Sequence, residues 1–138
     1  MSNKKEIKYK ISYGIEFLKE YPNYPRDQQN AIGLFLKAFK EYGLKDFSTF
    51  EGKLTPSWKN VDEGSPVYEF TKGNDLWHYH VGIPHYKQSD YHDQYKTSDY
   101  ILHFMLLDNR KEIVVVEITP HYDGYDNFWL PRPNYLIY

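Results

Sequence analysis

The stretch that decides the fold is Leu76-Trp77-His78-Tyr79-His80-Val81-Gly82, together with the apolar run from Tyr100 to Thr119. Both segments have the aromatic and β-branched residues and the alternation typical of β-strands. Side chains two residues apart in a strand point to the same face of the sheet, so His78 and His80 are expected to share one face. The sequence therefore predicts antiparallel strands that display two imidazoles side by side.

Length and composition indicate one domain without disulfides. A chain of 138 residues is long enough to bury a single core, and its lack of cysteine excludes disulfides and thiolate metal sites. The N-terminal segment, Met1 to Lys10, is polar and lysine-rich, with no apolar run for a signal peptide or a membrane span. We therefore expect a single cytoplasmic domain over residues 1–138, without a membrane partner.

Charge and aromatic content bear on the partner. The formal net charge of −2 gives no overall attraction to phosphate, so any contact with nucleic acid needs a local basic patch. The 15 Tyr, 8 Phe and 3 Trp favour a recognition surface without choosing its ligand, and an aromatic β core explains them equally well.

The N-terminal half, about residues 1–50, is predicted to be helical. From Asp27 to Tyr42 the apolar residues recur at steps of three and four, and Gly43 follows where a left-handed C-cap is expected. The other elements expected in this half are an edge strand or helix start at Lys8–Ser12 and a helix from Ile15 to Tyr21, stopped by Pro22 and Pro25.

The second half, about residues 65–125, is predicted to be a sheet. Phe50 to Gly64 is expected to be a loop, and so is Pro84 to Lys96. The residues Gly73-Asn74-Asp75 and Asp108-Asn109-Arg110 have the turn chemistry of hairpins. The predicted strands are Val67–Thr71, Leu76–Ile83, Tyr100–Leu107 and Lys111–Thr119.

Helices followed by strands imply an α+β fold, with the N-terminal helices packed on one face of a twisted antiparallel sheet of about four to five strands. The other face is then at least partly open. The tail, residues 126–138, is aromatic and stiffened by prolines. We expect it to close over the sheet, because Phe128 and Trp129 would otherwise expose a large apolar surface.

The histidines suggest acid-base chemistry on the open face. Imidazole titrates near neutrality, so His78 and His80 could act as base and acid in the cleavage of RNA, which needs no metal or cofactor. His103 either joins them or is a buried core histidine with a local hydrogen-bond partner. His121 and Tyr122 follow the last strand and are expected nearby.

Cations in flanking segments could hold the phosphate of such a substrate. Lys87, Lys96, Arg110 and Arg132 are the candidates, and for each the alternative is a solvated surface side chain.

A metal site is the second chemistry that His-X-His allows. Two histidines on a strand could be joined by another ligand, although none stands at a diagnostic spacing, and we therefore expect no metal and no cofactor. The residues that could complete such a site are His85, His92, His121, Asp90 and Asp123.

The order of these segments resembles a known family, the RelE/ParE superfamily of bacterial toxins, and within it the YafO-type toxins. The similarity covers Leu76 to Asp123, about a third of the chain. The segments that carry it are Tyr100–Phe104, Ile113–Ile118 and His121–Tyr125 for the superfamily, and His78–His80, Lys96–Asp99 and Pro120-His121 for the YafO type.

The resemblance implies an mRNA interferase, that is, a ribosome-dependent endoribonuclease held inactive by a cognate antitoxin. It also implies a helical pair on a twisted antiparallel sheet, with the catalytic groove on the free face. Many relatives are strongly basic, whereas this chain is mildly acidic, so delivery of the message by the ribosome matters more. The polar positions that match are His78, His80, Lys96, Thr97, Asp99 and His121.

A function without catalysis is the alternative. A small, acidic, aromatic-rich α+β domain is also typical of a protein-binding module, such as an immunity protein or a toxin that acts on a protein target. In that case the histidines and tyrosines are interface residues with no proton to move.

Overall fold

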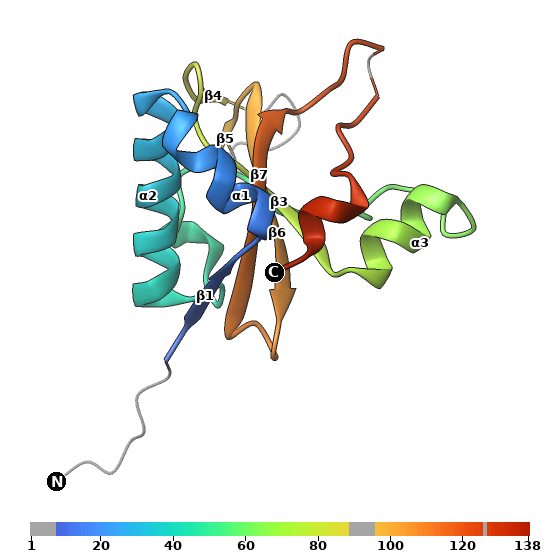
Figure 1. Cartoon of the computed structure of the whole chain (residues 1–138), viewed down its shortest axis with the longest axis horizontal. Helices are drawn as coiled ribbons and strands as arrows, with labels where there is room; N and C mark the ends of the chain where they lie inside the picture. The colour runs from blue at the N-terminus through green and yellow to red at the C-terminus, as the bar shows by residue number, and fades with distance from the viewer. Residues whose placement is uncertain (1–7, 89–95, 126) are drawn as a thin grey trace, which may run out of the picture.

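A mixed five-stranded sheet with helices on both faces forms the fold in the computed structural model, which describes residues 8–88, 96–125 and 127–138 (Figure 1). The α-helices are α1 (Ile15–Glu20), α2 (Arg26–Tyr42) and α3 (Pro66–Gly73), and 3-10 helices span Tyr21–Asn23, Phe47–Thr49 and Pro133–Leu136. The strands are β1 (Lys10–Tyr13), β2 (Leu54–Pro56), β3 (Leu76–His80), β4 (Lys87–Gln88), β5 (Lys96–Thr97), β6 (Tyr100–Leu107) and β7 (Glu112–Pro120).

The sheet has the order β1-β7-β6-β3-β2, and β4 and β5 form a separate two-stranded ribbon. The α+β class is confirmed, but the sheet is not fully antiparallel, because β1 runs parallel to β7. The other neighbours in the sheet are antiparallel. Most of the chain lies between β1 and β7. A connection of this length allows the two strands to run parallel.

Helices α1 and α2 cover one face of the sheet, as predicted (Figure 1). The apolar stripe of α2 buries Ile32, Phe35 and Phe39. The Phe35 ring lies 4.7 Å from that of Tyr79 on β3 and 5.4 Å from that of Phe104 on β6. Aromatic stacking between α2 and alternate residues of the strands therefore fixes which strand face is the main core.

Gly43 ends α2 with a positive φ of 66° but a ψ of −156°, so the expected left-handed cap is wrong in detail. Its N–H still donates to the Phe39 carbonyl over 2.8 Å. A side chain at this position would meet the ring of Tyr9 at 2.4 Å. Glycine is thus required by both the backbone conformation and the close approach.

Three predictions for the sheet half are wrong. Val67–Thr71 is helical and belongs to α3, because Ser65 caps the helix by accepting from the Tyr68 N–H and Pro66 follows at the first position. The turn after it leads from a helix into β3 and not between two strands. The expected loop Phe50–Gly64 contains β2, a short edge strand paired with β3.

The β6–β7 hairpin is confirmed. Asp108, Asn109 and Arg110 have φ values of 50°, 51° and 68°, the left-handed conformation that Asn and Asp tolerate best.

The face opposite α1 and α2 is half covered. Leu76, Met105, Val114 and Val116 form a buried cluster, here called the apolar patch. Phe70 of α3 and the C-terminal residues Tyr135 and Leu136 pack against the apolar patch. The tail thus closes over the sheet, as expected. Within the described residues, no helix is long and apolar enough to cross a membrane.

Candidate functional site

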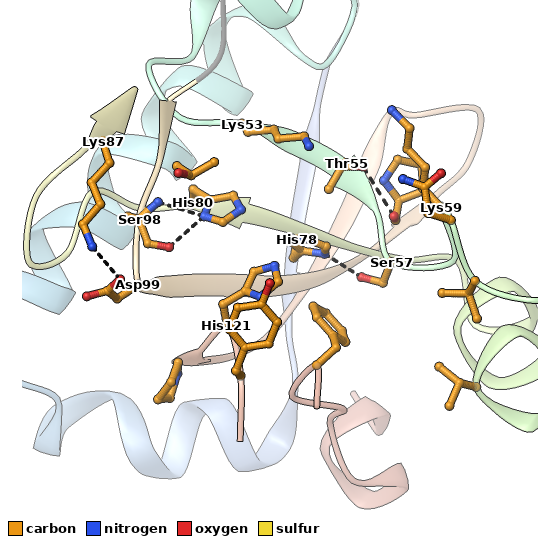
Figure 2. Close-up of a pocket in the computed structure, with 18 residues that line it drawn as sticks. Lys53, Thr55, Ser57, Lys59, His78, His80, Lys87, Ser98, Asp99 and His121 are labelled. Atoms are coloured by element: carbon orange, nitrogen blue, oxygen red, sulfur yellow. Dashed lines mark hydrogen bonds and ion pairs between the residues drawn. The ribbon is translucent and has the colours of Figure 1, made fainter. Parts of the chain in front are cut away.

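A cavity of about 810 Å³ lies beside the apolar patch on the same face of the sheet (Figure 2). Residues of β2 and β3 line one side, and the segments around β5 and the end of β7 line the other. The polar side chains that line it are Lys53, Thr55, Ser57, Lys59, Asn60, His78, His80, Lys87, Thr97, Ser98, Asp99, His121 and Tyr122.

Three imidazoles converge in this cavity. His78 and His80 project from β3, and His121 directly follows β7 and points toward them (Figure 2). Their ring centroids are 5.8 Å apart for His78 and His80, 5.5 Å for His78 and His121, and 5.3 Å for His80 and His121. We call these three residues the imidazole cluster. The predicted pairing of His78 and His80 on one strand face, with His121 nearby, is confirmed.

Each member of the imidazole cluster is held by a different contact. The Nδ1 of His78 lies 2.9 Å from Ser57 Oγ, just after β2. The Nδ1 of His80 lies 2.9 Å from the Ser98 carbonyl and 3.0 Å from the Ser98 backbone nitrogen. The backbone of His121 donates to the Asp99 carbonyl over 2.7 Å. Because Nδ1 of both β3 histidines is engaged, their Nε2 atoms are left for a ligand in the cavity.

His103 lies behind the imidazole cluster and does not line the cavity. It pairs with His78 in the sheet register, and the ring centroids are 6.5 Å apart. His103 is fully buried, with its Nε2 2.8 Å from Thr119 Oγ1, whose proton goes to the Pro120 carbonyl. His103 therefore shares the predicted face but is the buried histidine with a local partner, which is the second of the two predicted alternatives, and it does not line the cavity.

Burial keeps these imidazoles neutral. Desolvation lowers the pKa of His80 to about 4 and that of His103 to about 3. The pKa of His78 is lowered well below 6.5, first by burial and then by His103, His80 and His121. The pKa of His121 is also lowered by burial and by Lys53. In the free protein near pH 7 the imidazoles are unprotonated. His78 and His80, which the sequence predicts to act as base and acid, are therefore both in the basic form before a substrate binds.

Cationic side chains stand at the rim of the cavity. Lys53 and Lys59 lie on the β2 side, and burial lowers the pKa of Lys53, with a further contribution from Lys59. Lys87 lies on the opposite side and forms an ion pair with Asp99 over 3.0 Å (Figure 2). The chain is acidic overall, yet this cavity carries the local basic patch that phosphate binding needs.

Three of the predicted phosphate-binding residues, Lys96, Arg110 and the exposed Arg132, do not line the cavity. Lys96 does not line the cavity and lies 3.9 Å from Glu51. Arg110 lies in the β6–β7 turn, where its guanidinium stacks 5.4 Å from the ring of Trp77, a residue of the helix-covered face. Lys87, Thr97, Asp99 and Tyr122 do line the cavity, as predicted.

Sequence reasoning missed the β2 side of the site. Lys53, Thr55, Ser57 and Lys59 all line the cavity, and they alternate with a period of two. That alternation is the signal of a strand face, but Pro56 and the short length of the strand hid it.

Phe128 from the tail was expected to close over the sheet, and it covers the imidazole cluster. Its ring lies 4.9 Å from His78 and 5.3 Å from His121.

The other candidate metal ligands do not join the imidazole cluster. His85 is exposed. The Asp123 carboxylate accepts the backbone N–H groups of Tyr125 and Asn127. Asp90 and His92 lie outside the described residues.

Comparison with known proteins gives no relative: no family model, no curated protein and no solved structure matches the chain. The cavity itself therefore carries the functional argument. Neutral imidazoles and lysines that meet in one cavity can accept a proton beside a bound phosphate, or can bind a metal ion.

Proposed function

We propose that this protein is an endoribonuclease that cleaves mRNA in the cavity of the imidazole cluster, and that it is the toxin of a type II toxin–antitoxin pair. The observation that carries the proposal is that three neutral imidazoles and the cations Lys53 and Lys59 line one cavity. These are the groups that RNA cleavage requires, namely a proton acceptor for the ribose 2′-hydroxyl and positive charge for the phosphate.

The proposed reaction needs only groups of this chain. One imidazole of the cluster accepts the 2′-hydroxyl proton as the 2′ oxygen attacks phosphorus, and the bond from phosphorus to the 5′ oxygen breaks. The bound phosphodiester is anionic and favours the protonated form of a second imidazole, which then protonates the 5′ oxygen. Lys53 stabilises the negative charge on the phosphate. The expected products end in a 2′,3′-cyclic phosphate and a 5′-hydroxyl.

The toxin class rests on the resemblance to the YafO-type toxins. Of the positions that the resemblance singled out, His78, His80, Thr97, Asp99 and His121 line one cavity, whereas Lys96 does not. Positions that share a cavity although they are distant in sequence support a common role. The proposed partners are the ribosome with its message and a cognate antitoxin that blocks the cavity.

Delivery of the message by the ribosome fits the charge of the chain. The net charge of −2 gives no long-range attraction to free RNA, and the cations available to a phosphate in the cavity are the few that line it, Lys53, Lys59 and Lys87. We therefore expect cleavage in translating extracts and little cleavage of free RNA.

The test compares the wild type with the double variant His78→Ala/His80→Ala in translating extracts, with the 5′ and 3′ ends of the cleaved message mapped. Arg110→Ala is the matched control, since this cation is far from the cavity and should cleave like the wild type. The proposal fails if the wild type leaves the message intact, and a protein-binding function without catalysis then remains. If the double variant cleaves as well as the wild type, the site is wrong although the activity stands.

A further inference from the structure

We propose that His78, His80 and His121 form a binding site for a divalent transition-metal ion of the Zn²⁺ class, with one coordination position open to the cavity. One candidate ligand nitrogen of each histidine lies within 4.8 Å of the other two. Nitrogens on a tetrahedral zinc ion lie about 3.3 Å apart, because Zn–N bonds are about 2.0–2.1 Å long. Small side-chain rotations into the cavity would close this difference.

The contacts around the imidazole cluster match those of metal-ligating histidines. Such histidines usually donate their other ring N–H to a fixed oxygen, which orients the ring. The Nδ1 of His78 meets Ser57 Oγ at 2.9 Å. The Nδ1 of His80 lies 2.9 Å from the Ser98 carbonyl, to which its protonated form donates, and 3.0 Å from the Ser98 N–H, from which its unprotonated form accepts. In the tautomers with a proton on Nδ1, both Nε2 lone pairs are free to bind the ion.

An unpartnered atom supplies a second and independent observation. Among the described residues the Nδ1 of His121 is buried without a hydrogen-bond partner, as is the Nδ1 of His103 behind it, although buried ring nitrogens almost always have one. The ring is held between β3 and the tail by the hydrogen bonds of its own backbone to Asp99 and Trp129. Rotation of the ring about its bond to Cβ would exchange the positions of Nδ1 and Nε2. A metal ion bound by either nitrogen would therefore give this histidine a partner.

The ligand set selects the kind of metal. Among the described residues, the candidate ligands of the imidazole cluster are the three histidines alone. The nearby carboxylate of Asp99 is paired with Lys87. Neutral nitrogen ligands suit Zn²⁺, Co²⁺, Ni²⁺ and Cu²⁺, whereas Mg²⁺ and Ca²⁺ require oxygen ligands. Three protein ligands in an open cavity leave a fourth position for water or an anion, as catalytic zinc sites do.

Lys53 is the group that opposes a cation in this cavity. It lowers the pKa of each of His78, His80 and His121 through its charge, so it lies within electrostatic reach of all three. A metal ion at the site would therefore bind more tightly when this charge is removed, and an anion in the fourth position would be favoured while it is present.

The proposal is independent of RNA cleavage, and its test uses no RNA. The full chain is first stripped of metal with a chelator, and Zn²⁺ and Co²⁺ are then titrated in at pH 7.5 by calorimetry and visible absorption. We expect one ion per chain, with the intense Co²⁺ bands of a four-coordinate site. His121→Ala, the member of the cluster with the least burial, should weaken binding on the order of 100-fold or more, whereas His85→Ala should bind like the wild type.

Two further variants guard against loss of folding. Ser57→Ala removes only the oxygen beside His78 and should weaken binding roughly 10- to 100-fold while the fold is kept. Zn²⁺ should also raise the melting temperature of the wild type and of His85→Ala, but not that of His121→Ala. Absence of Zn²⁺ and Co²⁺ binding to the wild type, or equal binding by His121→Ala, overturns the proposal, while the cleavage experiment is unaffected by either result.

Discussion

The apolar patch and the imidazole cluster lie on the same face of the same sheet and share strand β3, yet they differ in chemistry. Leu76 is fully buried, and two and four residues along β3 His78 and His80 are only 6% and 5% exposed. Leu76 is covered by α3 and the C-terminal residues, whereas the two histidines line a cavity and are hydrogen-bonded to serines. Burial at one end of the face stabilises the fold, and at the other it keeps reactive groups neutral.

The largest expected effect separates activity from stability. His121→Ala should lower the rate of mRNA cleavage by about 10²- to 10⁴-fold, because it removes one group of the proposed acid-base machinery. The unfolding free energy should change little, since His121 is only partly buried. Rates in translating extracts and urea denaturation measure the two quantities. If His121→Ala instead lost stability but kept the wild-type cleavage rate per folded molecule, His121 would serve the fold and not the proposed reaction.

The reciprocal change is made in the apolar patch. Leu76→Ala should lower the unfolding free energy by about 2–5 kcal/mol, because it leaves a cavity between the sheet and the elements that cover it. Its cleavage rate should match that of the wild type at temperatures where the variant is folded. Equal loss of activity in Leu76→Ala would show that the two ends of the face are not separate.

Zinc should act on one end of the face only. A nitrogen lone pair that holds a metal ion cannot accept a proton, so saturating Zn²⁺ is expected to slow cleavage by more than about tenfold, and a chelator should restore it. This expectation requires both proposals. Faster cleavage with Zn²⁺ would instead indicate that a metal-bound hydroxide, and not an imidazole, is the base.

Acid should weaken the fold through the histidines. The folded pKa is about 4 for His80 and about 3 for His103, against 6.5 in the unfolded chain. The unfolded state thus binds more protons below pH 6.5, and stability falls as the pH drops from 6.5 to about 4.

Each of these groups contributes a slope of about 1.4 kcal/mol per pH unit in that window. Glu117 acts in the opposite direction, because burial and Glu20 raise its pKa to about 7, so its contribution is lost as the pH rises from 4.5 toward 7. Denaturation of the metal-free chain from pH 7 to pH 4.5 measures the sum, and Glu117→Gln should steepen the net decline. If the unfolding free energy of Glu117→Gln did not change between pH 7 and pH 4.5, the conclusion that His80 and His103 are buried in the neutral form would be wrong.

The smallest expected effect has opposite signs in two assays. Lys53→Met should slow cleavage on the order of tenfold, less than the loss of a fully buried donor, because this lysine is partly solvated. The same change should tighten Zn²⁺ binding, since it removes a positive charge beside the imidazole cluster. Lys59→Met is the matched control, because Lys59 is a more exposed cation of the same rim. It should change the cleavage rate and the Zn²⁺ affinity less than Lys53→Met does.

Parts of the fold with a strong local signal could be predicted. The stripe of α2 and the turn Asp108–Arg110 depend on spacing and backbone preference, which are properties of the sequence. The segment Val67–Thr71 is too short for alternation to be decisive, and the Ser65 cap with Pro66 makes it a helix. The β2 strand is only three residues long and gains its structure from pairing with β3.

In the site, too, features that depend on local sequence could be predicted, and features that depend on how the strands pair could not. Arg110 was predicted to bind phosphate because it lies in a segment that flanks the strands. The turn that contains it joins the end of β6 to the start of β7, so it lies at the opposite end of the hairpin from His121. His121 joins the imidazole cluster because β7 runs antiparallel to β6 and returns the chain to the end where His80 lies. Strand order and direction decide such distances, and neither is local.

The sequence by itself placed His78 and His80 on one strand face, because side-chain direction alternates along any β-strand. It also determined the helical stripe that selects the opposite face as the main core. Only the tertiary structure brought His121 and Lys53 to the same cavity, since their positions depend on how separate strands pair. It also decided that the imidazoles are neutral, because their pKa values depend on the burial supplied by distant parts of the chain.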